Sequence, residues 1–182
     1  REGGKLGDIY PIQSYKRDNN GNIIIRDGYP LIEESKGNDR KAIGNIQPKL
    51  LMSVTPSFAY KGIYLTALFD MKFGGDIVSM SESVATNYGM AKRTENRGTI
   101  TVKRVNEDGT PNTTAVDAES YYKRIANVAE EFLYDASFIK LKELSLGYSF
   151  PKTLLKKTPF NSLKVAFVAR NLCYLMSHTP GT

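Results

Sequence analysis

The sequence predicts an all-β fold of antiparallel strands, and three observations support this prediction. Apolar and polar residues alternate with a period of two over segments of about ten residues, which is typical of strands with one apolar face. The longest apolar runs, 165–169 and 172–176, have five residues, whereas a membrane-spanning helix needs about 18 or more. The alternating segments are joined by short connections at one end and by connections of tens of residues at the other.

The composition is that of a chain that folds. Its 182 residues include 25 basic and 19 acidic side chains, a net charge of +6, and 41% of them are hydrophobic. Disordered and collagen-like classes are therefore excluded. The basic residues are spread along the chain without a DNA- or RNA-binding motif, so we expect no nucleic-acid partner. The first five residues, REGGK, contain neither an initiator Met nor an apolar segment, and we expect an interior piece of a longer protein.

Short strands and turns are predicted near the N-terminus. Residues 8–16 are predicted to form a strand, and residues 18–21 (Asp-Asn-Asn-Gly) a turn into a short strand over 22–26. The turn superficially resembles a calcium loop, but its glycine is at the fourth position and Tyr29 stands where a bidentate glutamate is required. We therefore predict a turn and no metal site there.

The clearest local signal is a β-hairpin centred on Lys61-Gly62. Alternating segments 52–60 and 63–72 flank this two-residue turn. Pro56 lies in the first segment, and because it lacks an N–H donor it demands an edge strand or a bulge. One face of the second segment is wholly apolar, with Ile63, Leu65, Ala67, Phe69 and Met71.

A long stretch, residues 73–134, follows the hairpin and is rich in Ser, Thr, Asn and Gly. Within it we expect a strand at 98–105, a turn at 106–109 and a helix near 125–133. The helix is predicted by apolar residues at i, i+3, i+4, i+7 and i+8, namely Ile125, Val128, Ala129, Phe132 and Leu133. Glu130 and Glu131 are adjacent and could form an acid pair, but adjacent residues on a helix diverge in direction, so we expect them on its solvated face.

A second strand pair is predicted at 144–150 and 163–170, each with one wholly apolar face. The connection, 151–162, is long enough for one helical turn before Pro159. In both pairs we expect the apolar face to point outward and the small or polar face into a lumen. Four charged side chains then lie on the lumen side, where they line a transport path or form a salt-bridged wall: Asp70, Lys72, Lys164 and Arg170.

Two architectures fit this arrangement. Outer-membrane β-barrels have short periplasmic turns, long extracellular loops and an outward apolar band. In such a barrel, Tyr60, Tyr64, Tyr148 and Phe150 are expected near the periplasmic rim as an aromatic girdle. Lys140 and Lys142 share the outward side with Leu144, so that strand is expected to project past the bilayer. A soluble β-rich binding or adhesion domain also has one apolar face per strand, and the pattern leaves both architectures open.

A family resemblance distinguishes the two. Residues 134–151 are YDASFIKLKELSLGYSFP, which resembles a signature near the end of the SusC/RagA-like TonB-linked (TonB-dependent) outer-membrane transporters, and residues 169–172 (ARNL) match the following strand. Further matches occur in the same order and cover almost the whole chain: residues 7–10 (GDIY), 43–45 (IGN) with Pro48, 58–62 (FAYKG), 69–70 (FD) and 74–77 (GGDI).

The resemblance implies that residues 1–182 form the C-terminal part of a large antiparallel transmembrane β-barrel, of the 22-stranded plugged type. It implies a location in the outer membrane of a Gram-negative bacterium, in contact with its lipid. It also implies active import of large nutrients, glycans or peptides, with a SusD-like surface lipoprotein and a TonB complex as partners. The plug domain, through which TonB acts, the N-terminal strands and the closing strand are expected to lie outside this chain.

No catalytic, cofactor-binding or metal-ligating residues are predicted, and we expect a chain that is not an enzyme. The lone Cys173 is expected to be buried or lipid-facing, and the lone His178 has no partner at metal-ligand spacing. Ligand-binding residues are not assigned. Tyr88 and the pair Tyr121-Tyr122 are aromatic residues that could stack on sugar rings, anchor the long loop or contact the lid lipoprotein.

Overall fold

The structure, a computed structural model, describes residues 3–34, 36, 40–156 and 158–179, and the chain divides into two compact units. The strand unit comprises Pro48–Gly75 and Asp135–Thr182, and the loop unit comprises Arg1–Gln47 and Asp76–Tyr134. Within the described residues, no helix is both long and apolar enough to cross a membrane.

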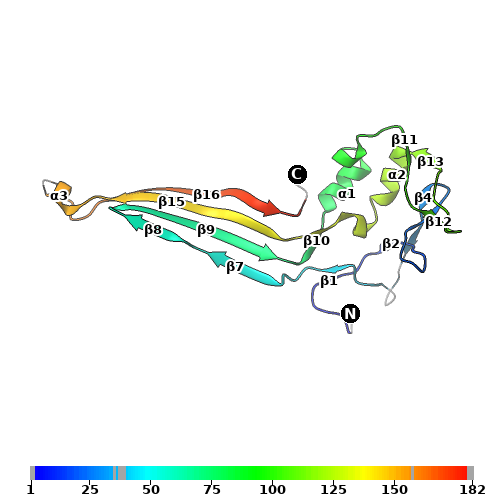
Figure 1. Cartoon of the computed structure of the whole chain (residues 1–182), viewed down its shortest axis with the longest axis horizontal. Coiled ribbons are helices and arrows are strands. Elements are labelled where there is room, and N and C mark those ends of the chain that lie inside the picture. Colours follow the sequence, from blue (N-terminus) through cyan, green and yellow to red (C-terminus); the bar gives the residue numbers. More distant parts are fainter. Residues whose placement is uncertain (1–2, 35, 37–39, 157, 180–182) are drawn as a thin grey trace. The chain divides into compact units, whose positions relative to one another are not determined.

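The strand unit is built on one antiparallel sheet of five strands, in the order β16-β15-β9-β7, with β8 also paired to β9 (Figure 1). The hairpin and the second strand pair predicted from the sequence are both present, and the pairing of β9 with β15 joins them. The strands are β7 (Leu50–Val54), β8 (Ser57–Tyr60), β9 (Ile63–Phe73), β15 (Phe138–Ser149) and β16 (Lys164–Ser177).

The turn between β8 and β9 has the geometry that a two-residue hairpin needs. Lys61 and Gly62 have φ values of 45° and 88°, and two consecutive positive φ values are typical of the type I′ turn, whose twist matches that of the flanking strands. The carbonyl of Gly62 also accepts a hydrogen bond from the Ser149 amide at 2.7 Å. The turn is thus held to the end of β15 as well.

Pro56 separates β7 from β8 without changing the register. Val54 pairs with Phe69 and Ser57 with Thr66, so both strands continue one line along β9. The Pro56 carbonyl still accepts a hydrogen bond from the Ala67 amide at 3.1 Å. The nitrogen of Pro56 faces β9 as its carbonyl does, so the missing N–H removes one bond of this ladder, where β7 and β8 are separate strands. Among the described residues this line lies at the edge of the sheet, as the proline predicts.

The connection between β15 and β16 contains the predicted helical turn, α3 (Lys152–Leu155), with Leu155 buried. Strand β16 runs to Ser177, well beyond the predicted end at residue 170. Asn171, with a φ of 54°, interrupts the alternation there, which explains why the period-two pattern underestimates the strand.

The loop unit consists of short paired strands around two helices. Its pairs are β1-β6, β2-β5, β3-β4, β10-β14 and β11-β13, with β12 parallel to β3. The strands are β1 (Asp8–Ile9), β2 (Gln13–Tyr15), β3 (Ile24–Arg26), β4 (Tyr29–Pro30), β5 (Ile32–Glu34), β6 (Gly44–Asn45), β10 (Asp76–Val78), β11 (Thr99–Thr101), β12 (Val105–Asn106), β13 (Ala115–Asp117) and β14 (Leu133–Asp135). The helices are α1 (Met80–Asn87), α2 (Ala118–Ile125) and the 3₁₀ turns η2 (Lys92–Thr94) and η3 (Ala129–Phe132).

Side-chain caps explain where the two helices begin. The Ser79 hydroxyl accepts a hydrogen bond from the Glu82 amide at 3.3 Å, and an Asp117 carboxylate oxygen accepts one from the Ser120 amide at 2.8 Å. Such caps satisfy amide groups that the first helical turn leaves without a partner.

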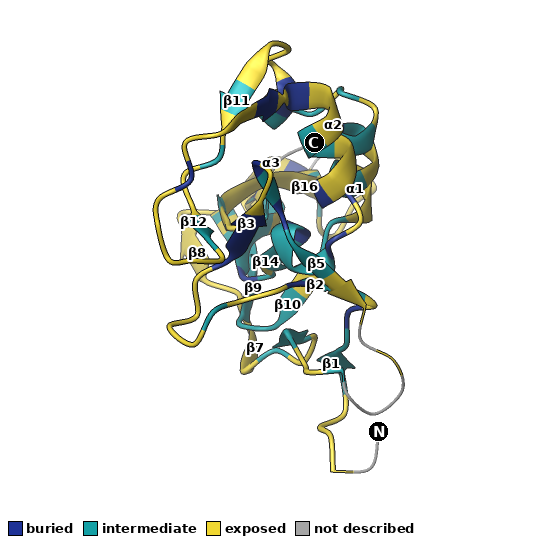
Figure 2. Ribbon diagram, turned by 90° about the vertical axis from the view of Figure 1, so that its right-hand side faces the viewer, coloured by how far each residue is buried: buried dark blue, intermediate teal, exposed yellow. Residues whose placement is uncertain are grey.

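A small core holds the loop unit together. It comprises Tyr15, Ile23, Ile125 and Val128, with Tyr121 and Tyr122 packed against it. In Figure 2 buried segments lie along β3 and on α2.

Three predicted elements of this region are wrong in part. The helix at 125–133 is absent, because α2 ends at Ile125, Val128 is extended and η3 follows. Its apolar residues Ile125, Val128 and Phe132 are nevertheless buried, so the spacing identified core positions but not their backbone. The strand at 8–16 is split into β1 and β2, which have different partners, and the strand at 98–105 is split into β11 and β12.

Both predicted turns are confirmed. At the first, an Asp18 carboxylate oxygen accepts hydrogen bonds from the Asn20 and Asn22 amides at 2.9 and 2.7 Å. This carboxylate is therefore used within its own turn. At the second, the Gly109 amide donates to the Asn106 carbonyl at 3.0 Å.

Candidate functional site

One face of the strand unit is apolar across the whole sheet. Residues directly opposite each other on antiparallel strands share a face, so the register defines this surface, which we call the apolar face. Its side chains are Met52, Val54, Phe58, Tyr60, Ile63, Leu65, Ala67, Phe69, Met71, Ile139, Leu141, Leu144, Leu146, Tyr148, Val165, Phe167, Ala169, Cys173 and Met176.

The apolar face has no cover among the described residues. None of its side chains is buried, and Phe167, Phe58 and Leu146 are 73%, 68% and 51% exposed. A soluble domain exposes few contiguous apolar surfaces of this extent, because burying such surface is the main drive of folding in water. Cys173 lies on this face and is exposed, which agrees with the lipid-facing alternative of the prediction.

The opposite face, which we call the polar face, carries an ion-pair ladder. Asp70 accepts from Lys142 Nζ at 3.1 Å and from Ser53 Oγ at 3.1 Å, and Glu143 pairs with Arg170 Nε at 2.9 Å. Asp70 and Arg170 therefore each form an ion pair on this face. Lys72 and Lys164 share this face.

A β-bulge corrects the predicted position of two lysines. Leu141 is opposite Phe69 and Glu143 is opposite Leu68, so Lys142 is an extra residue in β15. The extra residue shifts the alternation by one. Lys140 consequently lies opposite Asp70 on the polar face, and Lys142 reaches the same carboxylate. The prediction that both lysines share the outward side with Leu144 is wrong.

Tyr64 also differs from the prediction. It lies on the polar face opposite Gly147, and its ring fills the space that a Cβ at position 147 would occupy. It is therefore not part of an outward aromatic girdle. Tyr148, on the apolar face, instead packs edge to face on Phe150 with ring centroids 5.0 Å apart.

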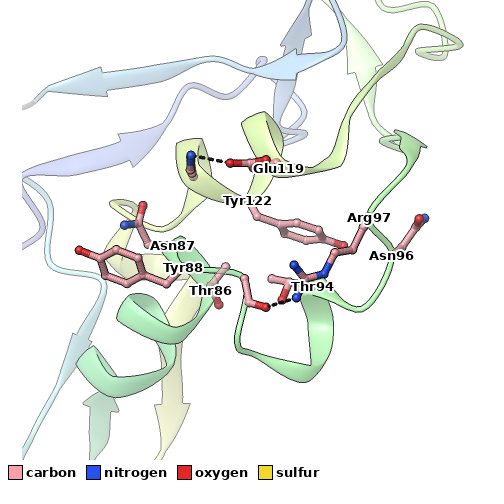
Figure 3. A pocket seen from close by; sticks show the side chains of 10 residues that line it. Thr86, Asn87, Tyr88, Thr94, Asn96, Arg97, Glu119 and Tyr122 are labelled. Carbon is pink, nitrogen blue, oxygen red and sulfur yellow. Dashed lines mark hydrogen bonds and ion pairs between the residues drawn. The ribbon is translucent and has the colours of Figure 1, made fainter.

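The loop unit contains a pocket of about 320 Å³ between α1, η2 and α2. Figure 3 shows the ring of Tyr122 extending from α2 toward Thr94 and Arg97. Two of the three tyrosines considered in the sequence line this pocket, Tyr88 at the C-terminal end of α1 and Tyr122 on α2. The structure thus brings together residues 34 positions apart in the chain, from 88 to 122.

Polar groups surround the two tyrosines of the pocket. Arg97 is held by its Nη2 donating to the Gly89 carbonyl at 2.8 Å, and Glu119 pairs with Lys123 at 2.6 Å. Asn87 and Asn96 also line the pocket. This mixture of aromatic rings with amide, guanidinium and carboxylate groups suits a ligand with apolar faces and several hydroxyl or amide groups.

Tyr121 has a structural role instead. It packs against the core of the loop unit, and this burial raises its pKa. Of the three alternatives open for this residue, anchoring the loop is the one that the packing supports.

Glu130 and Glu131 are not on a solvated helix face as predicted. Glu130 accepts from the Tyr15 amide at 2.6 Å and pairs with Arg17 at 2.9 Å. Glu131 accepts from the Tyr15 hydroxyl at 3.0 Å and pairs with Arg93 at 3.0 Å. Because η3 replaces the expected helix, both carboxylates reach Tyr15 of β2, more than 100 residues away in the chain, and Glu131 also reaches Arg93.

The remaining candidate residues form structural contacts. His178 Nδ1 lies 3.0 Å from Asp135 Oδ2, and Asp135 also accepts from the Ser137 hydroxyl at 2.6 Å. These hydrogen bonds, together with the charge on His178, lower the Asp135 pKa to about 2. In the part of the chain that the structure describes, no group of three or more His, Cys, Asp or Glu residues is placed to hold a metal ion.

Sequence reasoning missed Asn87, Asn96, Arg97 and Glu119 as pocket residues. They come from three separate places in the chain, Asn87, the adjacent pair Asn96-Arg97, and Glu119, and no motif in the sequence relates these places. Only the folding of the 73–134 stretch around α1 and α2 brings them together.

No family model matches the sequence. The chain is 26% identical to TonB-dependent receptor P3 of Formosa agariphila, over 94% of this chain and 18% of that protein. It is also 26% identical to TonB-dependent receptor P39 of the same organism, over 77% of this chain and 13% of that protein. The chain therefore spans less than a fifth of the length of these curated relatives.

Solved structures give a matching result for the fold. The chain superposes on the RagAB peptide importer in the closed-closed state with a TM-score of 0.57 and 19% identity, covering 94% of this chain and 20% of that chain. A second structure of the RagAB peptide transporter gives a TM-score of 0.51 and 18% identity, over 92% and 19% of the two chains. The resemblance recognised in residues 134–151 is thus confirmed: this chain is similar in sequence to TonB-dependent receptors and in fold to RagAB.

Proposed function

We propose that this chain forms part of the wall and extracellular loops of an outer-membrane, TonB-dependent nutrient importer. The observation that carries the proposal is the apolar face, which spans β7 to β16 and has no cover among the described residues. Lipid is the solvent for which such a face is suited, and the salt-bridged polar face is suited to a barrel lumen.

The strand lengths support a membrane wall. Strands β9, β15 and β16 have 11, 12 and 14 residues, whereas a tilted transmembrane strand needs about 9 to 11. The longer strands project beyond the bilayer. A closed barrel of this type has about 22 strands, so the sheet supplies a portion of it and the remaining strands, with the plug, come from the rest of the protein.

The connections give the wall its orientation. The Lys61-Gly62 turn and the α3 connection lie at one end of the sheet and are assigned to the periplasm, where turns are short. The loop unit, which connects to the other end, is assigned to the cell exterior. A SusD-like lipoprotein is the proposed partner on that side, and a TonB complex, acting through the plug, is the proposed partner in the periplasm.

The loop-unit pocket is the proposed contact for substrate. RagAB is a peptide importer, and the tyrosines of the pocket equally suit the apolar face of a sugar ring. We propose import of glycans or peptides, and uptake assays with both classes distinguish them.

Two experiments test the proposal. In the first, membranes of cells expressing the full-length protein are fractionated, and the protein is expected in the outer membrane. Recovery in a soluble fraction would favour a soluble binding or adhesion domain and would exclude the transporter.

The second experiment tests the pocket. Tyr88 is 71% exposed, and the one hydrogen bond that the Arg97 side chain makes to the described residues is with the Gly89 carbonyl, so both can be truncated without opening the core. Tyr88→Ala and Arg97→Ala are expected to weaken the apparent affinity of uptake by about tenfold each, equivalent to about 1.4 kcal/mol. Met90→Ala is the matched control, since Met90 is 73% exposed in the same unit but does not line the pocket. Unchanged uptake in both pocket variants would remove the pocket from the substrate path.

A further inference from the structure

A second hollow of the loop unit has an unusual charge. It is a groove of about 410 Å³, and three of its nine lining residues are basic while none is acidic. The basic residues are Arg17, Lys103 and Arg104, and the amides of Asn22 and Asn112 lie beside them. We call this hollow the basic groove.

The segment that carries two of these cations is held in place. The Arg104 carbonyl accepts from the Asn112 amide at 2.8 Å, and the Arg104 amide donates to the Val102 carbonyl at 2.9 Å. Asn112 is buried, and its side-chain amide donates to the same Val102 carbonyl at 2.9 Å. Hydrogen bonds therefore hold the backbone at Val102 and at Arg104, and this fixes the backbone positions from which the Lys103 and Arg104 side chains extend.

Arg17 is also positioned. Its Nη1 donates to the Gly21 carbonyl at 3.0 Å, and its Nη2 pairs with Glu130 at 2.9 Å. Glu130 is itself fixed by the Tyr15 amide. A guanidinium has five N–H donors, so most of the Arg17 donors remain for a ligand, although Glu130 balances its charge.

Lys103 and Arg104 lack the ion pairs that two arginines of the loop unit make. Arg26 pairs with Glu107, and Arg93 pairs with Glu82 and Glu131. Among the described residues, neither the Lys103 nor the Arg104 side chain has a hydrogen-bond or ion-pair partner. Two adjacent cations beside a third, with no acid lining the groove, attract an anion.

We propose that the basic groove is a binding site for an oxyanion, the carboxylate, sulfate or phosphate group of a ligand. The Arg104 guanidinium binds two oxygens through its planar fork, Lys103 supplies a point charge, and the Asn22 and Asn112 side of the groove limits the size of the group. The proposal requires only the loop unit and does not depend on transport.

Direct binding to the full-length protein in a zwitterionic detergent tests the site. Calorimetric titrations with inorganic phosphate, sulfate and acetate are compared at constant ionic strength in chloride. Lys103→Gln combined with Arg104→Gln is expected to weaken binding of the preferred anion at least about tenfold, and Arg104→Lys alone is expected to weaken it less. Arg17 is left intact because its substitution would also release Glu130.

A control variant separates site binding from net charge. Lys41→Gln combined with Lys92→Gln removes the same two charges from exposed positions of the loop unit outside the groove, and it is expected to bind like the original protein. Equal loss in both double variants, or no loss in either, overturns the proposal.

The source of the anion is resolved in lipid nanodiscs. Repeating the titration in phosphatidylcholine and in phosphatidylglycerol nanodiscs asks whether lipid headgroups compete for the groove. If phosphatidylglycerol weakens anion binding by the original protein but has no such effect on the Lys103→Gln, Arg104→Gln variant, the groove is assigned to a lipid headgroup. Equal phosphate affinity in both nanodiscs assigns it to a soluble anionic ligand.

Discussion

The contact between Gly147 and Tyr64 shows how a single residue shapes the polar face. The two are directly opposite each other, and a Cβ at position 147 would overlap the tyrosine ring. We expect Gly147→Ala to lower the free energy of unfolding by about 1 to 3 kcal/mol, because the ring must leave its place over the strand. Urea unfolding of the full-length protein, followed by heat-modifiable gel mobility, measures the change.

Two further variants isolate that clash. Gly98→Ala is a control, since a Cβ there meets only Asn96 Oδ1, at 3.7 Å, and little change is expected. Tyr64→Ala should remove the clash, so adding Gly147→Ala to it should cost less than adding it to the original protein. Equal costs in the two backgrounds would contradict the assigned packing.

Asp135 provides a pH-dependent contact at the end of the sheet. Hydrogen bonds from Ser137 and His178 lower its pKa from an ordinary value of 3.8 to about 2 in the folded protein. A depressed folded pKa stabilises the fold above the unfolded value, and the stabilisation is lost as the pH falls from about 4 toward 2. Asp135→Asn is therefore expected to be less stable than the original protein at pH 7 and equally stable near pH 2.

The measurement for Asp135 is urea unfolding at a series of pH values. Glu95→Gln is the control, because Glu95 is exposed and has no ion pair among the described residues; its difference from the original protein should not change across the same pH window. A constant difference for Asp135→Asn between pH 7 and pH 2 would show that the carboxylate charge contributes nothing.

At the scale of elements, the bulge at Lys142 sets which side chains face outward. Deleting Lys142 removes the extra residue and makes Leu141 and Glu143 neighbours, so that their pairs with Phe69 and Leu68 fit simple alternation. Leu141 then stays on the apolar face and Lys140 on the polar face. We expect a cysteine at Leu141 to be reached by a lipid-soluble thiol reagent, and a cysteine at Lys140 by a water-soluble one, both in the original protein and after the deletion. Lys142→Gln is the control, since it keeps the bulge and loses an exposed ion pair worth about 0 to 1 kcal/mol. Exchange of the two labelling patterns after the deletion would argue against the assigned bulge.

The bulge also illustrates what the sequence could predict. Strict alternation from Ile63 to Met71 and the Lys61-Gly62 turn specify the hairpin locally, so both were predictable. Lys142 and Asn171 each change the phase of a strand, and such irregularities are set by pairing with neighbours, which a single sequence does not display. The apolar stripe at 125–132 identified buried positions, but core packing and the Glu130 and Glu131 contacts selected a 3₁₀ turn over a helix.

The candidate sites were predictable to a smaller degree. Tyr88 and Tyr122 are candidates from the sequence because aromatic rings can stack on sugar rings, whereas Arg97 and Lys103 resemble any exposed basic residue in the sequence. Their positions depend on contacts between distant segments, such as the pinning of 102–104 by Asn112. The charge of the basic groove, and the residues that line the pocket, can be identified only in the folded structure.

For the whole molecule, the two faces of one strand predict opposite responses to the same charge. Leu146 lies on the apolar face between Leu65 and Phe167, and its neighbour Ser145 lies on the polar face between Thr66 and Val168. A lysine facing lipid near the bilayer centre costs about 2 to 4 kcal/mol, whereas a lumen position tolerates it. Leu146→Lys is therefore expected to reduce the folded protein in the outer membrane severalfold, and Ser145→Lys to leave it nearly unchanged. Quantitative gel mobility of outer-membrane fractions compares them; equal yields would mean that the apolar face packs against protein, and the membrane-wall proposal would fail.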